Sequence, residues 1–145
     1  MKKTFFIIFF PIVSFLIANI DVVLGWNYEL LGDRFNYLKQ VEDPLFNSYN
    51  SIFSYFNYEF LWFRILHIIK FVTNPDNPNF VLRVVVFLSS LIFLKAFKRR
   101  TNSYLLPLFI IFLPGVIELY IVKIRHGLAL SIFAYISSFR FIKFK

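Results

Sequence analysis

Residues 59–73 read EFLWFRILHIIKFVT, and whether this stretch crosses a membrane decides the topology of the chain. The stretch is apolar enough to form a helix, but it is short and carries charged and polar side chains, namely Glu59, Arg64, His67 and Lys70. A membrane-spanning helix needs roughly twenty mostly apolar residues, and charges inside it are costly. We therefore predict a short interfacial or re-entrant helix that does not cross.

The composition around this stretch indicates an integral membrane protein. Of the 145 residues, 59% are hydrophobic and 22 are Phe, more than a soluble domain of this size buries. Four stretches are long and apolar enough to cross a bilayer as helices: 4–24, 80–97, 104–124 and 126–142. We predict an all-α integral membrane protein, one polytopic domain over residues 1–145, with about four transmembrane helices and one short interfacial or re-entrant helix within an outer loop over residues 25–79.

The first of these stretches has the basic start and apolar middle of a secretory signal peptide. Around Ala18 there is no pair of small residues at the spacing that cleavage requires. We predict an uncleaved signal-anchor helix, with a cleaved peptide as the alternative.

Two later stretches have features that predict how they pack. In 104–124, Pro107 and the pair Pro114-Gly115 remove or weaken helical hydrogen bonds, so a kink is expected. In 126–142, small residues recur on one helical face: Gly127, Ser131, Ala134 and Ser138. Such a face lets helices approach closely in a membrane, which predicts partner helices.

The positions of the charges predict an orientation. Cytoplasmic flanks are rich in Lys and Arg, and a cytoplasmic N-terminus with a non-crossing 59–73 places three basic clusters inside: Lys2 and Lys3; Lys95, Lys98, Arg99 and Arg100; Arg140, Lys143 and Lys145. Seven of the eight carboxylates then lie outside: Asp21, Glu29, Asp33, Glu42, Asp43, Glu59 and Asp76. We predict a multi-pass bacterial plasma-membrane protein with the basic clusters as topology signals.

Several classes of function are disfavoured by composition. The net charge is +8, but the cations adjoin apolar runs instead of forming a polar stripe, so no nucleic-acid partner is expected. The chain has no Cys, which excludes disulfides and thiol catalysis, and its two His are too few for a metal cluster of their own. We predict neither a metal nor a cofactor.

Three short patterns would meet at the outer face. They are Gly32-Asp33-Arg34-Phe35-Asn36-Tyr37, Tyr58-Glu59-Phe60-Leu61 and Arg125-His126-Gly127-Leu128-Ala129-Leu130. A carboxylate at the membrane surface can act as general base for a sugar hydroxyl, and an arginine is a strong bidentate partner for phosphate. Chemistry on lipid-linked sugars needs both groups.

The order of these motifs resembles the EpsG-like family of bacterial exopolysaccharide polymerases, relatives of the Wzy-type O-antigen polymerases. The family's Gly-Asp-x-x-x-Tyr pattern is matched by Gly32, Asp33 and Tyr37, and its Glu before a short apolar helix by Glu59. Its Arg-Gln-Gly-Leu-Ala helix start is matched here by Arg125, Gly127, Leu128 and Ala129, with His126 in place of the Gln. Family members usually have ten or more spans, so the chain resembles the N-terminal part of one.

The resemblance implies a polymerase that transfers a growing glycan between polyprenyl-diphosphate-linked repeat units at the outer leaflet. It implies Asp33 or Glu59 as base or hydroxyl-binding group and Arg125 as the group that stabilises the leaving diphosphate. Sugar or phosphate would be bound by Arg34, Tyr37 and His126. The expected partners are the lipid-linked oligosaccharide, membrane lipid and other proteins of envelope polysaccharide assembly.

Structural roles for the same residues remain open alternatives. Asp33 and Glu59 could cap turns or helices, and Arg125 or Lys123 could form an ion pair with Glu118. His67 and His126 could be interfacial side chains. Two other functions also remain open: a transporter or flippase fragment, which Glu118 within a span would favour, and a non-catalytic membrane partner that binds through the small-residue face of 126–142.

Overall fold

The computed structural model describes residues 2–25, 32–42, 60–73 and 77–140. Within these ranges the protein consists of eight α-helices, which confirms the predicted all-α class. Their bounds are α1 Lys2–Ala18, α2 Ile20–Leu24, α3 Gly32–Glu42, α5 Phe60–Thr73, α6 Pro78–Thr101, α7 Leu105–Ile111, α8 Pro114–Ile121 and α9 Ile124–Arg140.

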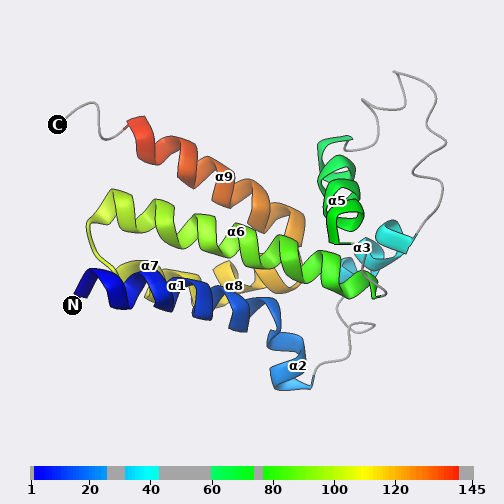
Figure 1. The fold of residues 1–145 in the computed structure, drawn as a ribbon, viewed down its shortest axis with the longest axis horizontal. Helices are drawn as coiled ribbons and strands as arrows, with labels where there is room; N and C mark the ends of the chain where they lie inside the picture. The colour runs from blue at the N-terminus through cyan, green and yellow to red at the C-terminus, as the bar shows by residue number, and fades with distance from the viewer. Residues whose placement is uncertain (1, 26–31, 43–59, 74–76, 141–145) are drawn as a thin grey trace.

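The long helices lie side by side with α6 in the middle; α6 and α9 run in the same direction and α1 runs in the opposite one (Figure 1). Helix α6 packs against α1, α7 and α9, and α8 packs against α1 and α9. At one end of this bundle α1 begins and α6 and α9 end (Figure 1). We call it the basic end, after the cations in those turns: Lys2, Lys3, Lys98, Arg99, Arg100 and Arg140.

The opposite end carries α2, α3 and α5, which we call the ionic end after Asp21, Arg34 and Arg83. In Figure 1, α5 crosses the direction of α6 instead of running alongside it. This arrangement agrees with the prediction of a short helix over 59–73, although Glu59 itself lies outside the described residues.

Helix α6 is the core of the bundle. Its buried residues include Val85, Val86 and Phe93, and its ends are fixed by Asn77, whose side chain accepts a hydrogen bond from the backbone N–H of Asn79, and by Asn102 in the left-handed conformation. With 24 residues and a mean hydropathy of 2.2 over its best window, α6 is the one helix in the described part of the chain that is long and apolar enough to cross a membrane. It extends the predicted 80–97 at both ends.

The predicted stretch 4–24 is not one continuous helix. It breaks at Asn19, whose side-chain amide donates to the carbonyl of Phe15, and the five-residue α2 then ends at Gly25, which has φ +64°. Positive φ is readily adopted by glycine. The segment therefore changes direction just before the ionic end (Figure 1).

The predicted stretch 104–124 also divides, into α7 and α8. Pro114 is the first residue of α8, a position that needs no helical N–H bond, and the break falls at Phe112 and Leu113. Pro107 is the third residue of α7, where its missing N–H would have no intrahelical partner, so it does not break the helix. The kink expected from the two prolines is thus found at Pro114 alone.

One part of the predicted outer loop proves to be a helix. We expected the motif over residues 32–37 to lie in this loop without predicting a helix there, and residues 32–42 form α3. Asp33 in its first turn and Lys39 in its last turn both complement the helix dipole. The buried residues Arg34, Tyr37 and Val41 recur at helical spacing and form the face that packs on the rest of the protein.

Candidate functional site

Contacts with α5 hold helix α3 in place. The rings of Tyr37 and Trp62 meet edge to face, with centroids 5.2 Å apart. The indole N–H of Trp62 donates to the side-chain carbonyl of Gln40 at 3.1 Å, and Lys70 Nζ donates to the backbone carbonyl of Val41 at 2.6 Å. Two short helices that could not fold alone thereby form one unit at the ionic end.

A buried carboxylate links this unit to the bundle. Oδ2 of Asp21, in α2, lies 3.0 Å from Nη2 of Arg83 in α6 and 3.9 Å from Nη2 of Arg34 in α3. Asp21 and Arg34 are 1% and 0% exposed. Charges are almost never buried unless they are paired, so this cluster fixes the relative positions of three helices.

Arg34 also contacts the end of α8. Its Nη1 donates to the carbonyl oxygen of Ile121, the last residue of that helix, at 3.4 Å. A cation stabilises the carbonyl groups at a helix C-terminus. Since α9 begins three residues later, this bond brings α3 close to the start of α9.

Two of the predicted site residues, Asp33 and Arg125, act electrostatically on a third, Tyr37, at this point. Burial raises the pKa of Tyr37, the positive charge of Arg125 opposes the rise, and the negative charge of Asp33 adds to it. Asp33 also interacts electrostatically with Lys123. A carboxylate from α3 and a guanidinium from α9, 92 positions apart in the sequence, therefore lie within electrostatic reach of the same phenol.

The predicted site residues differ in exposure. Asp33 and His126 are exposed, Arg125 is half-buried in the first turn of α9, and Arg34 is fully buried. The burial of Arg34 suits a role in holding α3 in place, while its predicted contact with sugar or phosphate stays a prediction. Glu59 lies outside the described residues.

We expected that Glu118 could form an ion pair with Arg125 or with Lys123, and it pairs with Lys123. Nζ of Lys123 lies 3.0 Å from Oε1 of Glu118, and both side chains are about half exposed. Glu118 is thus placed on the surface of the bundle and bound to Lys123. The structural role that we offered as an alternative, an ion pair with Glu118, is therefore found for Lys123.

Sequence reasoning missed the roles of Asp21 and Arg83. Each is a single charge close to one end of an apolar helical stretch, and a charge in such a place usually has a partner nearby. That position could have suggested the pair. Among the described residues no group of three or more His, Cys, Asp and Glu is arranged to hold a metal ion.

Three comparisons with known proteins found no match to this chain. No family model matches the chain, and neither a curated protein nor a solved structure matches it significantly. The resemblance to the EpsG-like polymerases therefore rests on the motifs and their order. The geometry of the ionic end has to be judged on its own chemistry.

Proposed function

We propose that the chain is a multi-pass plasma-membrane protein with a cytoplasmic N-terminus, and that it is a polysaccharide polymerase of the EpsG-like type or the N-terminal part of one. In this proposal 4–24, 80–97, 104–124 and 126–142 cross the bilayer, and α3 and α5 lie at its outer surface. The observation that carries it is the convergence of Asp33, Tyr37 and Arg125 at the ionic end.

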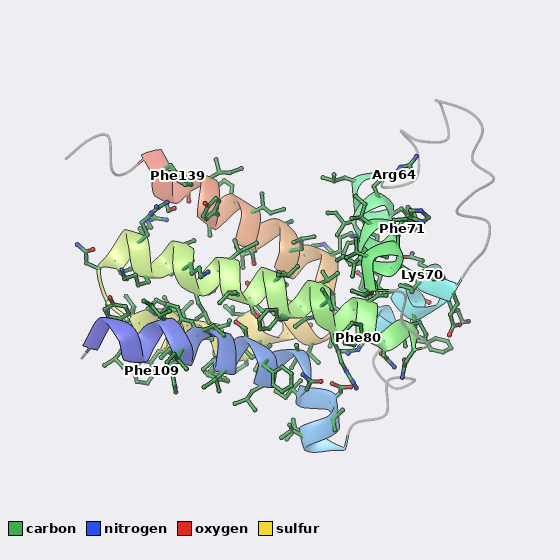
Figure 2. All side chains as sticks on the ribbon, in the orientation of Figure 1. Arg64, Lys70, Phe71, Phe80, Phe109 and Phe139 are labelled. Carbon is green, nitrogen blue, oxygen red and sulfur yellow. The ribbon has the colours of Figure 1, made fainter. Side chains whose placement is uncertain are left out.

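Exposed apolar side chains support the membrane part of the proposal. Large hydrophobic residues cover the outside of several helices, and Figure 2 marks four of them on different helices: Phe71, Phe80, Phe109 and Phe139. Phe71 and Phe109 are 81% and 72% exposed. Soluble proteins rarely expose apolar surface on this scale, whereas lipid would cover it.

The separation of charges supports the orientation. The basic turns of α1, α6 and α9 lie at the same end of the bundle, as they would if α5 did not cross (Figure 1). The described carboxylates lie elsewhere, in α2, α3 and α8. Helices of 17 residues such as α1 and α9 are about 26 Å long, close to the roughly 30 Å of a bilayer's hydrocarbon core.

The ionic end supports glycan transfer from a diphosphate carrier. In the proposed reaction a hydroxyl of the acceptor sugar attacks the anomeric carbon of the donor, a new glycosidic bond forms, and the bond to the diphosphate breaks. Asp33, which is exposed, accepts the hydroxyl proton. Arg125 stabilises the charge that develops on the leaving diphosphate, and the phenol of Tyr37 binds sugar or phosphate.

No observation favours the two rival functions. The small-residue face of α9, offered as the surface for a partner protein, is buried against this chain's own helices: Gly127 contacts α8 and Ser131 bonds with Tyr120. Glu118, which alone favoured a transporter, is a half-exposed member of a surface ion pair. We therefore retain the polymerase.

The test is polymer length on lipid-linked glycan in a polymerase-deletion strain. The chain is expressed alone and joined to any spans encoded downstream in its reading frame, and the form that restores long chains is then changed to Asp33→Ala, Glu59→Ala or Arg125→Ala. Removing a base or a charge-stabilising group should shorten or abolish polymer at equal expression.

The matched control is Lys39→Ala, which removes an exposed charge from the same helix as Asp33. It should leave polymer length unchanged. The proposal would be overturned if all three site variants made normal polymer. It would also be overturned if an extended chain that inserts correctly made no polymer.

A further inference from the structure

In the part of the chain that the structure describes, the helices that meet at the basic end carry cations but no carboxylate side chain. Helices α1, α6, α7 and α9, which meet there, contain no Asp or Glu. The four carboxylates in the described ranges belong to α2, α3 and α8, and those of Asp21 and Glu118 are bound to cations there. Among the described residues no carboxylate forms an ion pair with Lys98 or Arg99, so the charge of these two cations is available to an external anion.

Aromatic rings hold two of these cations at fixed places. The guanidinium carbon of Arg99 lies 4.4 Å from the ring centroid of Phe139, and Nζ of Lys98 lies 4.9 Å from that of Tyr104. These contacts join the last turn of α6 to α9 and to the turn before α7. A ring binds one side of a cation and leaves the others open, and Arg99 and Lys95 remain exposed.

The same cations border exposed apolar surface. Leu105 and Phe109 on α7 are 59% and 72% exposed, and Phe139 beside Arg99 is 45% exposed; Figure 2 marks Phe109 and Phe139. A nucleic acid would leave these apolar side chains in water. A bilayer surface places phosphate groups at the level of the cations and acyl chains against the apolar residues.

We infer that the basic end binds the phosphate headgroups of anionic phospholipids, with Lys98 and Arg99 as the principal contacts. Lys95 adds charge from the preceding turn of α6. This surface is separate from the ionic end and takes a different ligand. It depends on the membrane location but not on polymerase activity.

The experiment measures retained lipid on the purified full chain. Protein in neutral detergent is mixed with equal amounts of phosphatidylglycerol and phosphatidylcholine, and bound lipids are counted by native mass spectrometry. A basic residue near an anionic surface increases binding about fivefold. Lys98→Gln combined with Arg99→Gln should therefore lower the preference for phosphatidylglycerol about thirtyfold.

The matched control removes two cations from the other end, Lys39→Gln with Arg64→Gln. Lys39 also lies 4.4 Å from a ring centroid, that of Phe35, so both pairs lose a cation–π contact. The control should keep the wild-type preference. Three results would overturn the inference. The two variants could lose the preference equally, or the wild-type chain could retain both lipids equally. The wild-type chain could also bind an RNA oligonucleotide in preference to phosphatidylglycerol.

Discussion

Nη2 of Arg83 lies 3.0 Å from Oδ2 of Asp21, and this contact joins residues 62 positions apart in the sequence. Asp21 is 1% exposed and also faces Arg34, so one buried carboxylate serves α2, α3 and α6. The position of α3, and with it that of Asp33, depends on this cluster. Removing the Asp21 carboxylate should therefore lower the free energy of unfolding, whatever its effect on activity.

Asp21→Ala should destabilise the protein strongly. Removing one member of a buried ion pair leaves the charge of the other in a poorly solvated place, which costs about 3–5 kcal/mol. Thermal unfolding in detergent measures the effect. Glu42→Ala, which removes an exposed carboxylate at the end of α3, is the control and should change stability by less than about 0.5 kcal/mol. Similar unfolding temperatures for the two variants would contradict a structural role of the cluster.

Gly127→Ala should weaken the packing of α9 on α8. A Cβ at Gly127 would lie 2.7 Å from the carbonyl oxygen of Leu119 and 3.0 Å from Cδ1 of Tyr120, so the backbone of α8 would have to move. Overpacking of this kind costs about 1–3 kcal/mol. The free energy of unfolding in detergent should fall by that amount.

Gly115→Ala is the matched control, because a Cβ there meets nothing within 4 Å. It should leave stability unchanged or raise it by up to about 1 kcal/mol, since alanine favours a helix over glycine. If Gly127→Ala is as stable as Gly115→Ala, α8 and α9 do not approach as closely as described.

The close approach at Gly127 could be predicted from sequence, while α3 and the Asp21 cluster could not. The small-residue face of α9 is a local pattern, and its expected packing is found in the contact with Leu119 and in the 2.8 Å contact between the hydroxyls of Tyr120 and Ser131. In α3 the buried positions include Arg34, and a charged residue masks the apolar periodicity. The Asp21–Arg83 pair depends on how distant helices meet, which no local pattern contains.

Tyr37 should limit stability at alkaline pH. Its pKa in the folded protein is raised above 10.0, chiefly by burial, so the unfolded chain loses the phenolic proton first. The stability due to Tyr37 is thus fully present below pH 10 and is lost as the pH rises through the folded pKa. Denaturant unfolding at a series of pH values should show a smaller alkaline loss for Tyr37→Phe than for the wild type.

The neighbours of Tyr37 offer a control on this assignment. Arg125→Gln removes the charge that lowers the pKa of Tyr37 and should raise it further, whereas Asp33→Asn should bring it closer to 10.0. Opposite or equal shifts in the two charge variants would contradict the placement of Asp33 and Arg125 beside Tyr37.

Single cysteines should react from opposite sides of the membrane at the two ends of the bundle. The chain has no Cys, so Asn36→Cys on α3 and Ser103→Cys after α6 each introduce one thiol. In intact spheroplasts a membrane-impermeant maleimide should label Asn36→Cys alone, and Ser103→Cys should react only after permeabilisation, because the basic residues before it favour the cytoplasm. Labelling of both cysteines in intact spheroplasts would place the basic and ionic ends on the same side, as a crossing α5 would, and would contradict the proposed topology.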